Sequence, residues 1–271
     1  MHTPDMLKFV LYPCVRVRTP KGGGSGTIIY SGLNEKNEYD TFVLTCHHVI
    51  DDAITVTDEW DPLLGKERKK EHRSRVIVEE FKYKYGSRTI GVRSCEADIV
   101  VWHKRYDLAV LKLRSIEKAE HVAPLYPHDK TIEIQLLDPV VAVGCALGHP
   151  PIVTEGRITS MSDEVDSVSY WMSDAQIIFG NSGGAIFHCG LYGFSFIGVP
   201  SMIGIAGWGT PVTHMGYFSD IERIYRWLTD ECYQFLYDSS YTQSRCDTMR
   251  EEKRMRELEM YKRQLPIIDK G

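Results

Sequence analysis

The chain has 271 residues, of which 43% are hydrophobic and 25% are charged, and its formal net charge is −5 at pH 7. This composition excludes wholesale disorder, and the acidic balance argues against a dedicated nucleic-acid-binding protein. No apolar run reaches the roughly 18 residues that a membrane-spanning helix needs. We therefore expect a soluble globular protein with a large core, and neither nucleic acid nor membrane among its partners.

The cysteines carry no metal-binding signature. No CxxC pair joins any of the seven, which are Cys14, Cys46, Cys95, Cys145, Cys189, Cys232 and Cys246. We therefore expect no zinc site, no other metal and no cofactor. The first residues include Asp5 and lack the basic flank and long apolar stretch of a signal peptide. Together these features predict an intracellular, cytoplasmic setting with free thiols.

Up to about residue 218, the sequence is a series of short segments rich in Val, Ile, Phe and Tyr that are bounded by turn residues. Such segments are typical of strands in a sandwich or barrel. They lie at residues 26–30, 41–45, 75–83, 98–102, 108–113, 140–143, 156–160, 185–187, 196–199 and 202–205. No strand–helix alternation and no fixed-period repeat occurs, which predicts an all-β domain. The charged segment 66–75 (KERKKEHRSR) is predicted to be an exposed loop.

Three segments along these strands carry side chains suited to acyl transfer. Residues 43–50 (VLTCHHVI) end a predicted strand with His47 and His48, and an imidazole can take the proton of a serine hydroxyl. Residues 106–113 (YDLAVLKL) place Asp107 at the start of an apolar strand, where a carboxylate can orient that imidazole. Each segment alone has a structural explanation, as a core histidine or a surface aspartate.

The third segment is residues 179–184 (FGNSGG), in which Ser182 is flanked by glycines. Alone, a glycine-rich turn is more often a hairpin connection. Glycines can also free backbone amides to point at one spot beside a nucleophilic hydroxyl, where they stabilise a tetrahedral oxyanion. The order His, Asp, Ser favours this second interpretation.

A helix is predicted after Ser219, which forms a capping-box pattern with Glu222. Apolar residues recur at three- and four-residue steps as far as Phe235. The charged tail 239–271 has helical spacing of Met255, Leu258, Tyr261 and Leu265. A solvated helix is favoured there over a helix that docks on a partner.

At these motifs the sequence resembles the chymotrypsin-fold (trypsin-like) serine proteases, and most closely the HtrA/Deg branch, without a PDZ domain. The resemblance rests on Gly24-Ser25-Gly26, on residues 45–49 (TCHHV), on residues 107–112 (DLAVLK) and on Asp174-Ala175 leading into residues 180–184 (GNSGG). It spans residues 24–228.

The resemblance implies a chymotrypsin-like double barrel: two six-stranded antiparallel β-barrels followed by a C-terminal helix and a charged helical tail. The implied protease domain covers residues 1–238, with a first barrel at about 20–125, a second at about 130–220 and the helix at 219–238. The tail covers residues 239–271.

The resemblance also implies the roles of the site residues. Ser182 is the expected nucleophile, His48 the general base and acid, and Asp107 the residue that orients His48. The amides of Gly180 and Ser182 are expected to form the oxyanion hole. The substrate pocket is expected to include Gln176, Ile177, Ile178, Ser201, Gly216 and Phe218. No acid lies in these segments, so a preference for Lys or Arg is not expected, and Ile177 and Phe218 favour a small or medium apolar side chain.

The expected function is that of an HtrA-like serine endopeptidase acting on protein or peptide substrates. Three alternatives remain open: a latent enzyme, an inactive protease-fold scaffold, and a viral or phage processing protease. Metal binding through His47 and His48 is the weakest rival, since neighbouring residues of a strand face opposite sides. The C-terminal tail could mediate a homo-oligomer or a larger assembly. Asn181 stands where digestive proteases carry an aspartate that pairs with a new N-terminus, so activation by zymogen cleavage is not expected.

Overall fold

The computed structural model describes residues 3–61 and 66–264. The chain divides into two compact units, residues 1–224 and 225–271. The first unit contains every strand. Its short helices are α1 (Thr3–Met6), η1 (Leu7–Leu11), α2 (His47–Ile50), η2 (Asp51–Ala53), η3 (Thr131–Glu133), η4 (Ala146–Gly148) and η5 (Gly207–Gly209).

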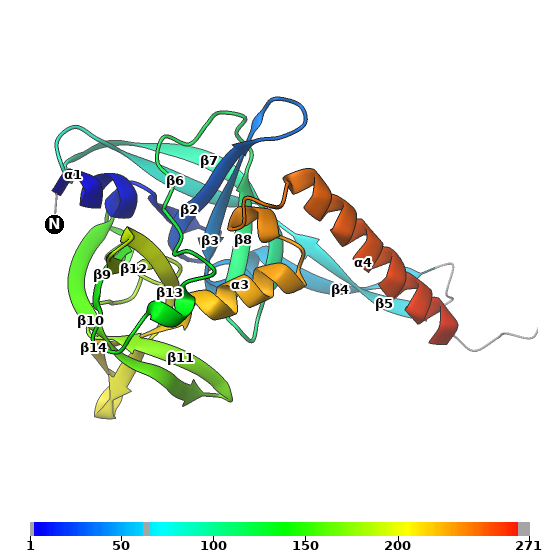
Figure 1. The fold of residues 1–271 in the computed structure, drawn as a ribbon. Helices are drawn as coiled ribbons and strands as arrows, with labels where there is room; N and C mark the ends of the chain where they lie inside the picture. The colour runs from blue at the N-terminus through cyan, green and yellow to red at the C-terminus, as the bar shows by residue number, and fades with distance from the viewer. Residues whose placement is uncertain (1–2, 62–65, 265–271) are drawn as a thin grey trace, which may run out of the picture. The chain divides into compact units, whose positions relative to one another are not determined.

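Two closed barrels of six strands each make up the first unit (Figure 1). The first has the order β1-β2-β3-β8-β7-β6. Its strands are β1 (Cys14–Arg18), β2 (Gly23–Leu33), β3 (Tyr39–Thr45), β6 (Val76–Tyr83), β7 (Thr89–His103) and β8 (Leu108–Leu113). All of its neighbouring strands pair antiparallel.

The second barrel has the order β10-β11-β14-β13-β12-β9 and is also antiparallel throughout. Its strands are β9 (Pro139–Gly144), β10 (Ile152–Val165), β11 (Val168–Ser173), β12 (Ala185–Gly190), β13 (Gly193–Ala206) and β14 (Thr210–Asp220). The expected chymotrypsin-like double barrel is therefore confirmed.

Each barrel has its own apolar interior. Val15, Val43 and Leu111 are fully buried in the first barrel, and Val143 and Phe196 are fully buried in the second. Burial of such side chains on closed sheets is the main driving force for this fold. Closure also removes the exposed strand edges that an open sheet would leave.

The expectation of a loop at residues 66–75 was wrong. Residues Lys66–Arg73 form strand β5, which pairs with β4 (Ile54–Asp61) as a separate two-stranded hairpin. Lys70 and His72 both bond the carboxylate of Glu59 across the hairpin, at 2.8 and 2.7 Å. Pairing of opposite charges between the two strands therefore stabilises this hairpin. The sequence of the segment has no alternation of apolar and polar residues that would predict a strand.

The C-terminal part of the chain is helical but interrupted. α3 (Ile221–Asp230) begins in the first unit, and η6 (Gln234–Leu236) and α4 (Gln243–Gln264) follow it. Cys232 has a left-handed backbone with φ of 58°, so the single helix expected over 219–238 ends early. Asp220, in place of the expected Ser219, caps α3 by accepting the Arg223 amide at 3.0 Å.

Leu265, the last of the apolar residues expected at helical spacing in the tail, lies outside the described residues. Within the described residues, no helix has the length and apolarity needed to cross a membrane.

Candidate active site

The first barrel holds a histidine–aspartate pair. β3 ends at Thr45 and His48 follows on α2, while Asp107 immediately precedes β8. Asp107 Oδ2 lies 2.7 Å from His48 Nδ1, and Asp107 Oδ1 accepts the backbone amide of His48 at 2.9 Å. Both carboxylate oxygens therefore fix the same residue, and they leave His48 Nε2 as the ring nitrogen available for proton transfer.

Charge and burial set the protonation of this pair. Burial alone would lower the pKa of His48, but the hydrogen bond and negative charge of Asp107 outweigh it and raise that pKa. Burial would raise the pKa of Asp107, but the bonds from His48 and Ser201 and the charge on the imidazole hold it below its usual range. Asp107 is thus a carboxylate that stabilises an imidazolium on His48.

Ser201 supports the aspartate from the second barrel. It lies on β13, is buried, and donates its hydroxyl hydrogen bond to Asp107 Oδ2. The family resemblance implies only that Ser201 belongs to the substrate pocket. The contact with Asp107 has no signal in the sequence, because the two residues are 94 positions apart.

His47, the neighbour of His48 in the sequence, contacts other residues. His47 is buried, and its ring lies 4.8 Å from that of Trp102, whose indole nitrogen donates to Glu71 at 3.1 Å. Burial lowers the pKa of His47, which keeps it neutral. The two histidines lie on a helical turn and not on a strand, and only His48 faces Asp107.

Ser182 lies on a tight turn of the second barrel just before β12. The turn is closed by the Asn181 amide, which donates to the Ile178 carbonyl at 3.0 Å, and by the Gly184 amide, which donates to the Asn181 carbonyl at 2.9 Å. Gly183 has φ of 84°, and a Cβ there would lie 2.2 Å from the Ser25 carbonyl oxygen. Only glycine fits that position.

One hydrogen bond fixes the orientation of the peptide before Gly180. The Phe179 carbonyl accepts the Leu147 amide at 2.7 Å, which directs that oxygen toward η4. Because carbonyl and amide of a trans peptide point in opposite directions, the Gly180 amide faces away from η4. Among the hydrogen bonds of the described residues, neither the Gly180 nor the Ser182 amide has an acceptor. The two amides expected to hold an oxyanion are therefore free to do so.

A buried serine of the first barrel fastens this turn. Ser25 Oγ donates to the Gly180 carbonyl at 2.6 Å and accepts the Cys145 amide at 2.7 Å. Its own amide donates to the Ser182 carbonyl at 2.8 Å. Ser25 thus ties the glycine turn to the first barrel at two carbonyls.

Ser182 and His48 line one cavity of about 380 Å³, which we call the triad cavity. Its remaining walls are mainly apolar: Ile177, Ile178, Phe179, Asn181, Pro200, Ser201, Met202, Ile203 and Ile205. Ser182 Oγ donates to the Ser201 carbonyl at 3.4 Å, and within the described residues no hydrogen bond joins it to His48. Such long or misaligned contacts are common in substrate-free sites and shorten in the Michaelis complex.

The predicted pocket residues fall into two groups. Ile177, Ile178 and Ser201 line the triad cavity, and Gly216 lies directly beside Ile177, whose Cδ1 would be 2.5 Å from a Cβ at that glycine. Gln176 is exposed and does not line the cavity, although its carbonyl accepts Thr154 Oγ1 at 2.8 Å.

Phe218 does not line the cavity either. It is fully buried in the second barrel, with its ring 6.0 Å from that of Trp171. The pocket wall expected from the resemblance included residues 198–201, and therefore Pro200, but it missed Met202, Ile203 and Ile205, which follow along β13 and extend the apolar wall.

Cys46 lies behind the histidine. Its buried thiol donates to the Pro200 carbonyl at 3.2 Å, and burial together with the Asp107 charge raises its pKa well above the usual value. Within the described residues, Cys46, His48 and Asp107 form one group with ligand atoms inside 4.8 Å of one another. A protonated thiol is a poor metal ligand, and His48 Nδ1 is already bonded to Asp107. All seven cysteines are free thiols.

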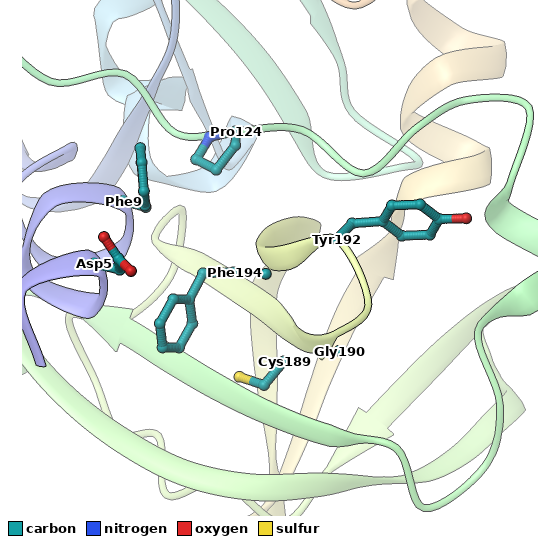
Figure 2. Close-up of a pocket in the computed structure, with 8 residues that line it drawn as sticks. Asp5, Phe9, Pro124, Cys189, Gly190, Tyr192 and Phe194 are labelled. Atoms are coloured by element: carbon teal, nitrogen blue, oxygen red, sulfur yellow. The ribbon is translucent and has the colours of Figure 1, made fainter. Parts of the chain in front are cut away.

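A second cavity, of about 450 Å³, shares no lining residue with the triad cavity, and Figure 2 shows side chains that line it. Asp5 and Phe9 of the N-terminal helical segment line it together with Cys189 and Phe194 of the β12–β13 hairpin. Burial raises the pKa of Cys189 to about 12, so its thiol is protonated and is not a second nucleophile.

The pattern of the trypsin-like peptidase domain matches residues 24–191. The chain belongs to this family. It contains a trypsin-like peptidase domain built on the double barrel, and the triad cavity lies where α2 and β13 meet the glycine turn. No curated protein sequence matches the chain.

Solved structures of HtrA-type proteases share the fold. The HtrA-type protease AlgW with a tripeptide superposes with a TM-score of 0.60 at 19% identity, covering 87% of this chain and 64% of AlgW. AlgW with a decapeptide gives 0.58 at 18% identity, covering 87% and 67%. The MamO protease domain from Magnetospirillum magneticum gives 0.54 at 19% identity, covering 81% and 97%. The chain thus spans about two thirds of AlgW and nearly all of the MamO domain.

Proposed function

We propose that this peptidase is a serine endopeptidase that works through Ser182, His48 and Asp107. The observation that carries the proposal is one cavity that contains both Ser182 and His48, with His48 held 2.7 Å from Asp107 and two unbonded amides beside the serine. Nucleophile, base, orienting carboxylate and oxyanion donors are the complete set that acyl transfer requires.

In the proposed reaction, Ser182 Oγ attacks the scissile carbonyl carbon and its proton passes to His48 Nε2. The carbonyl oxygen becomes an oxyanion bonded by the Gly180 and Ser182 amides. The C–N bond then breaks as His48 returns the proton to the leaving amine, which leaves an acyl group on Ser182. Water, deprotonated by His48, hydrolyses this ester by the same steps in reverse order.

The triad cavity supports a small or medium aliphatic side chain on the acyl side of the scissile bond. Ile177 is 4% exposed and fills the space beside Gly216, while Ile203 stands on the wall formed by β13. The described lining carries no carboxylate that could pair with Lys or Arg. We therefore expect cleavage after Ala, Val or Leu in preference to Lys, Arg or Trp.

A fluorophosphonate probe tests the proposal directly, since it reacts only with a serine activated by a neighbouring base. The parent protein is labelled beside Ser182→Ala and His48→Ala, and peptide mapping locates the modified residue. Internally quenched peptides that differ only in the residue before the scissile bond then measure kcat/KM.

We expect labelling at Ser182 in the parent and none in either variant. A folded parent that neither reacts nor cleaves any peptide would reject the proposed activity and leave a protease-fold scaffold. Circular dichroism of all three proteins distinguishes that result from misfolding.

A further inference from the structure

A third cavity begins on the other side of the glycine turn. It measures about 380 Å³, and we call it the arginine cavity; it is lined by Arg16, Val17, Arg18, Gly22, Gly23, Gly24, Cys145, Gly148 and Gly180. It shares no residue with the triad cavity, yet Gly180 lines one while Phe179 and Asn181 line the other.

The position of Gly180 assigns a role to this cavity. Its amide is one of the two proposed oxyanion donors, so the scissile carbonyl of a bound substrate would lie between the two cavities. The acyl half of a substrate enters the triad cavity, which contains the apolar pocket. The leaving-group half therefore runs toward the arginine cavity. At the rim of the cavity, a Cβ added to Gly22 would have no other atom within 4 Å. The backbone at Gly22 is therefore accessible to a peptide.

Two guanidinium groups share one carboxylate at this wall. Arg16 and Arg18 alternate on β1, so their side chains lie on one face of the strand. Arg16 Nε lies 2.5 Å from Glu79 Oε2, and Arg18 Nη1 lies 3.0 Å from Glu79 Oε1. The Glu79 side chain is 6% exposed, and both of its oxygens are occupied. Two positive charges against one negative charge leave the group with an excess of one positive charge.

The two arginines differ in the number of their partners and in their exposure to solvent. Arg16 also donates to the Gly148 carbonyl and lies over the Phe81 ring at 5.5 Å, so it has three partners and its side chain is only 25% exposed. The Arg18 side chain is 60% exposed and uses only Nη1 in the contact with Glu79. Within the described residues its Nε and Nη2 have no hydrogen-bond partner, so they can form a paired bond with a carboxylate.

No acidic side chain is among the described residues that line this cavity. The β1–β2 turn does carry one nearby acid contact, since the Lys21 amide donates to Asp52 at 2.9 Å. Asp52 is not part of the cavity wall, and the Lys21 side chain adds a further positive charge to the same turn.

We propose that the arginine cavity binds a carboxylate carried by the substrate within the first few residues after the scissile bond. The carboxylate is either an Asp or Glu side chain or the C-terminus of the peptide. This inference rests on the proposed function and names its substrate class: peptides with an acidic group on the leaving-group side.

The test uses internally quenched peptides with one aliphatic sequence up to the scissile bond. Glu, Gln or Lys is placed at each of the next three positions, with an amidated C-terminus, and a second series carries Gln throughout and ends as a free acid or an amide. Each peptide is measured with the parent, Arg18→Ala, Arg18→Glu and the control Arg75→Ala. Arg75 is matched to Arg18, because its side chain is 52% exposed and it pairs with one glutamate, Glu96, at 2.7 Å.

For the parent we expect kcat/KM to be about fivefold to tenfold higher for Glu than for Gln at its best position, as one partly exposed ion pair allows. Salt should reduce the ratio. Arg18→Ala should bring it to about 1, Arg18→Glu should favour Lys, and Arg75→Ala should keep the parent's ratio. A gain only for the free-acid series would identify the peptide C-terminus as the carboxylate and would equally support the site.

Equal rates for Glu and Lys in the parent, or a Glu preference that survives Arg18→Ala, would overturn the inference while leaving the peptidase intact. Should the parent cleave no peptide, the proposed function fails and the site is judged by binding. Fluorescence anisotropy of Ser182→Ala with the same peptides then decides: acid-selective, Arg18-dependent binding supports the site, and unselective binding or none overturns it.

Discussion

The two barrels contribute to the site in different ways. The first supplies an imidazole and a carboxylate, on His48 and Asp107, whose side chains are already bonded at 2.7 Å. The second supplies Ser182 on a turn whose shape depends on backbone contacts, with Ser182 Oγ bonded to the Ser201 carbonyl and not to His48. Electrostatic attraction therefore organises one half, and backbone conformation at glycines organises the other.

Because the two barrels contribute differently, mutations in each should affect different properties of the site. Loss of the charge pair should change proton affinity and leave the turn in place. Loss of the turn should remove the oxyanion donors and leave the titration of His48 in place. Ser25 and Ser201 are the exceptions, because each bonds from its own barrel to a residue of the proposed triad in the other.

The largest effect is expected for Asp107→Asn. An amide cannot stabilise an imidazolium and favours the wrong tautomer of His48, so kcat should fall by about 10⁴-fold. Steady-state kinetics on the best peptide measures it. Asp40→Asn is the matched control, since Asp40 is a buried carboxylate of the same barrel that pairs with Lys112 at 2.6 Å. An equal loss of kcat in both variants would show that the effect is structural.

Gly180→Ala should act on the second barrel alone. Gly180 has φ of 96°, and a Cβ would lie 2.6 Å from the Cys145 carbonyl oxygen, so the peptide must reorient and withdraw its amide. We expect kcat to fall about 10²- to 10³-fold. Gly86→Ala shares the positive φ, at 52°, but has no atom within 4 Å of its Cβ and should keep kcat. Full activity of Gly180→Ala would contradict the assigned oxyanion donor.

Ser25→Ala should produce a smaller, mixed effect. The change leaves the Gly180 carbonyl and the Cys145 amide without their buried partner, which costs about 1–3 kcal/mol of unfolding free energy. Because the turn loses its anchor, kcat should also fall about tenfold with little change in KM.

The control for Ser25 is Ser31→Ala on the same strand. Ser31 Oγ bonds Thr41 Oγ1 at 2.9 Å and accepts the Ala119 amide at 3.0 Å, far from the turn in sequence and contacts. Urea unfolding and kinetics of both variants separate the two roles. If both lose similar stability and neither loses kcat, the Ser25 hydroxyl is structural only.

The smallest effect is a shift in pH dependence. Asp107 raises the pKa of His48, and catalysis needs the neutral ring, so kcat/KM should fall on the acid side with a midpoint above 6.5. In Asp107→Asn burial still lowers the pKa of His48 and only the charge of Asp51 opposes it, so the midpoint should move below that of the parent. NMR titration of His48 in Ser182→Ala, with and without Asp107→Asn, measures both values. An unchanged midpoint would contradict the electrostatic role of Asp107.

Local patterns indicate nine of the twelve barrel strands and the motifs of the proposed triad, but they miss β1, β11 and β14. Residues 108–113 (LAVLKL), for example, are predicted with the bounds that β8 has in the structure, because a short, mostly apolar run between polar residues is typical of a buried strand. The β4–β5 hairpin escapes prediction, because its pairing depends on cross-strand charges such as Glu59 with Lys70 that carry no periodic signal.

The sequence by itself determined the residue types and the order His48, Asp107, Ser182, because each of these residues lies in a short motif that can be recognised locally. Only the tertiary structure decided which apolar side chains form the pocket wall, that Phe218 belongs to the core, and that Ser25, Ser201 and the two arginines of β1 surround the site. The physical reason is that these roles arise from contacts between barrels or between distant strands. Such contacts form only when the sheets close, and no local pattern encodes them.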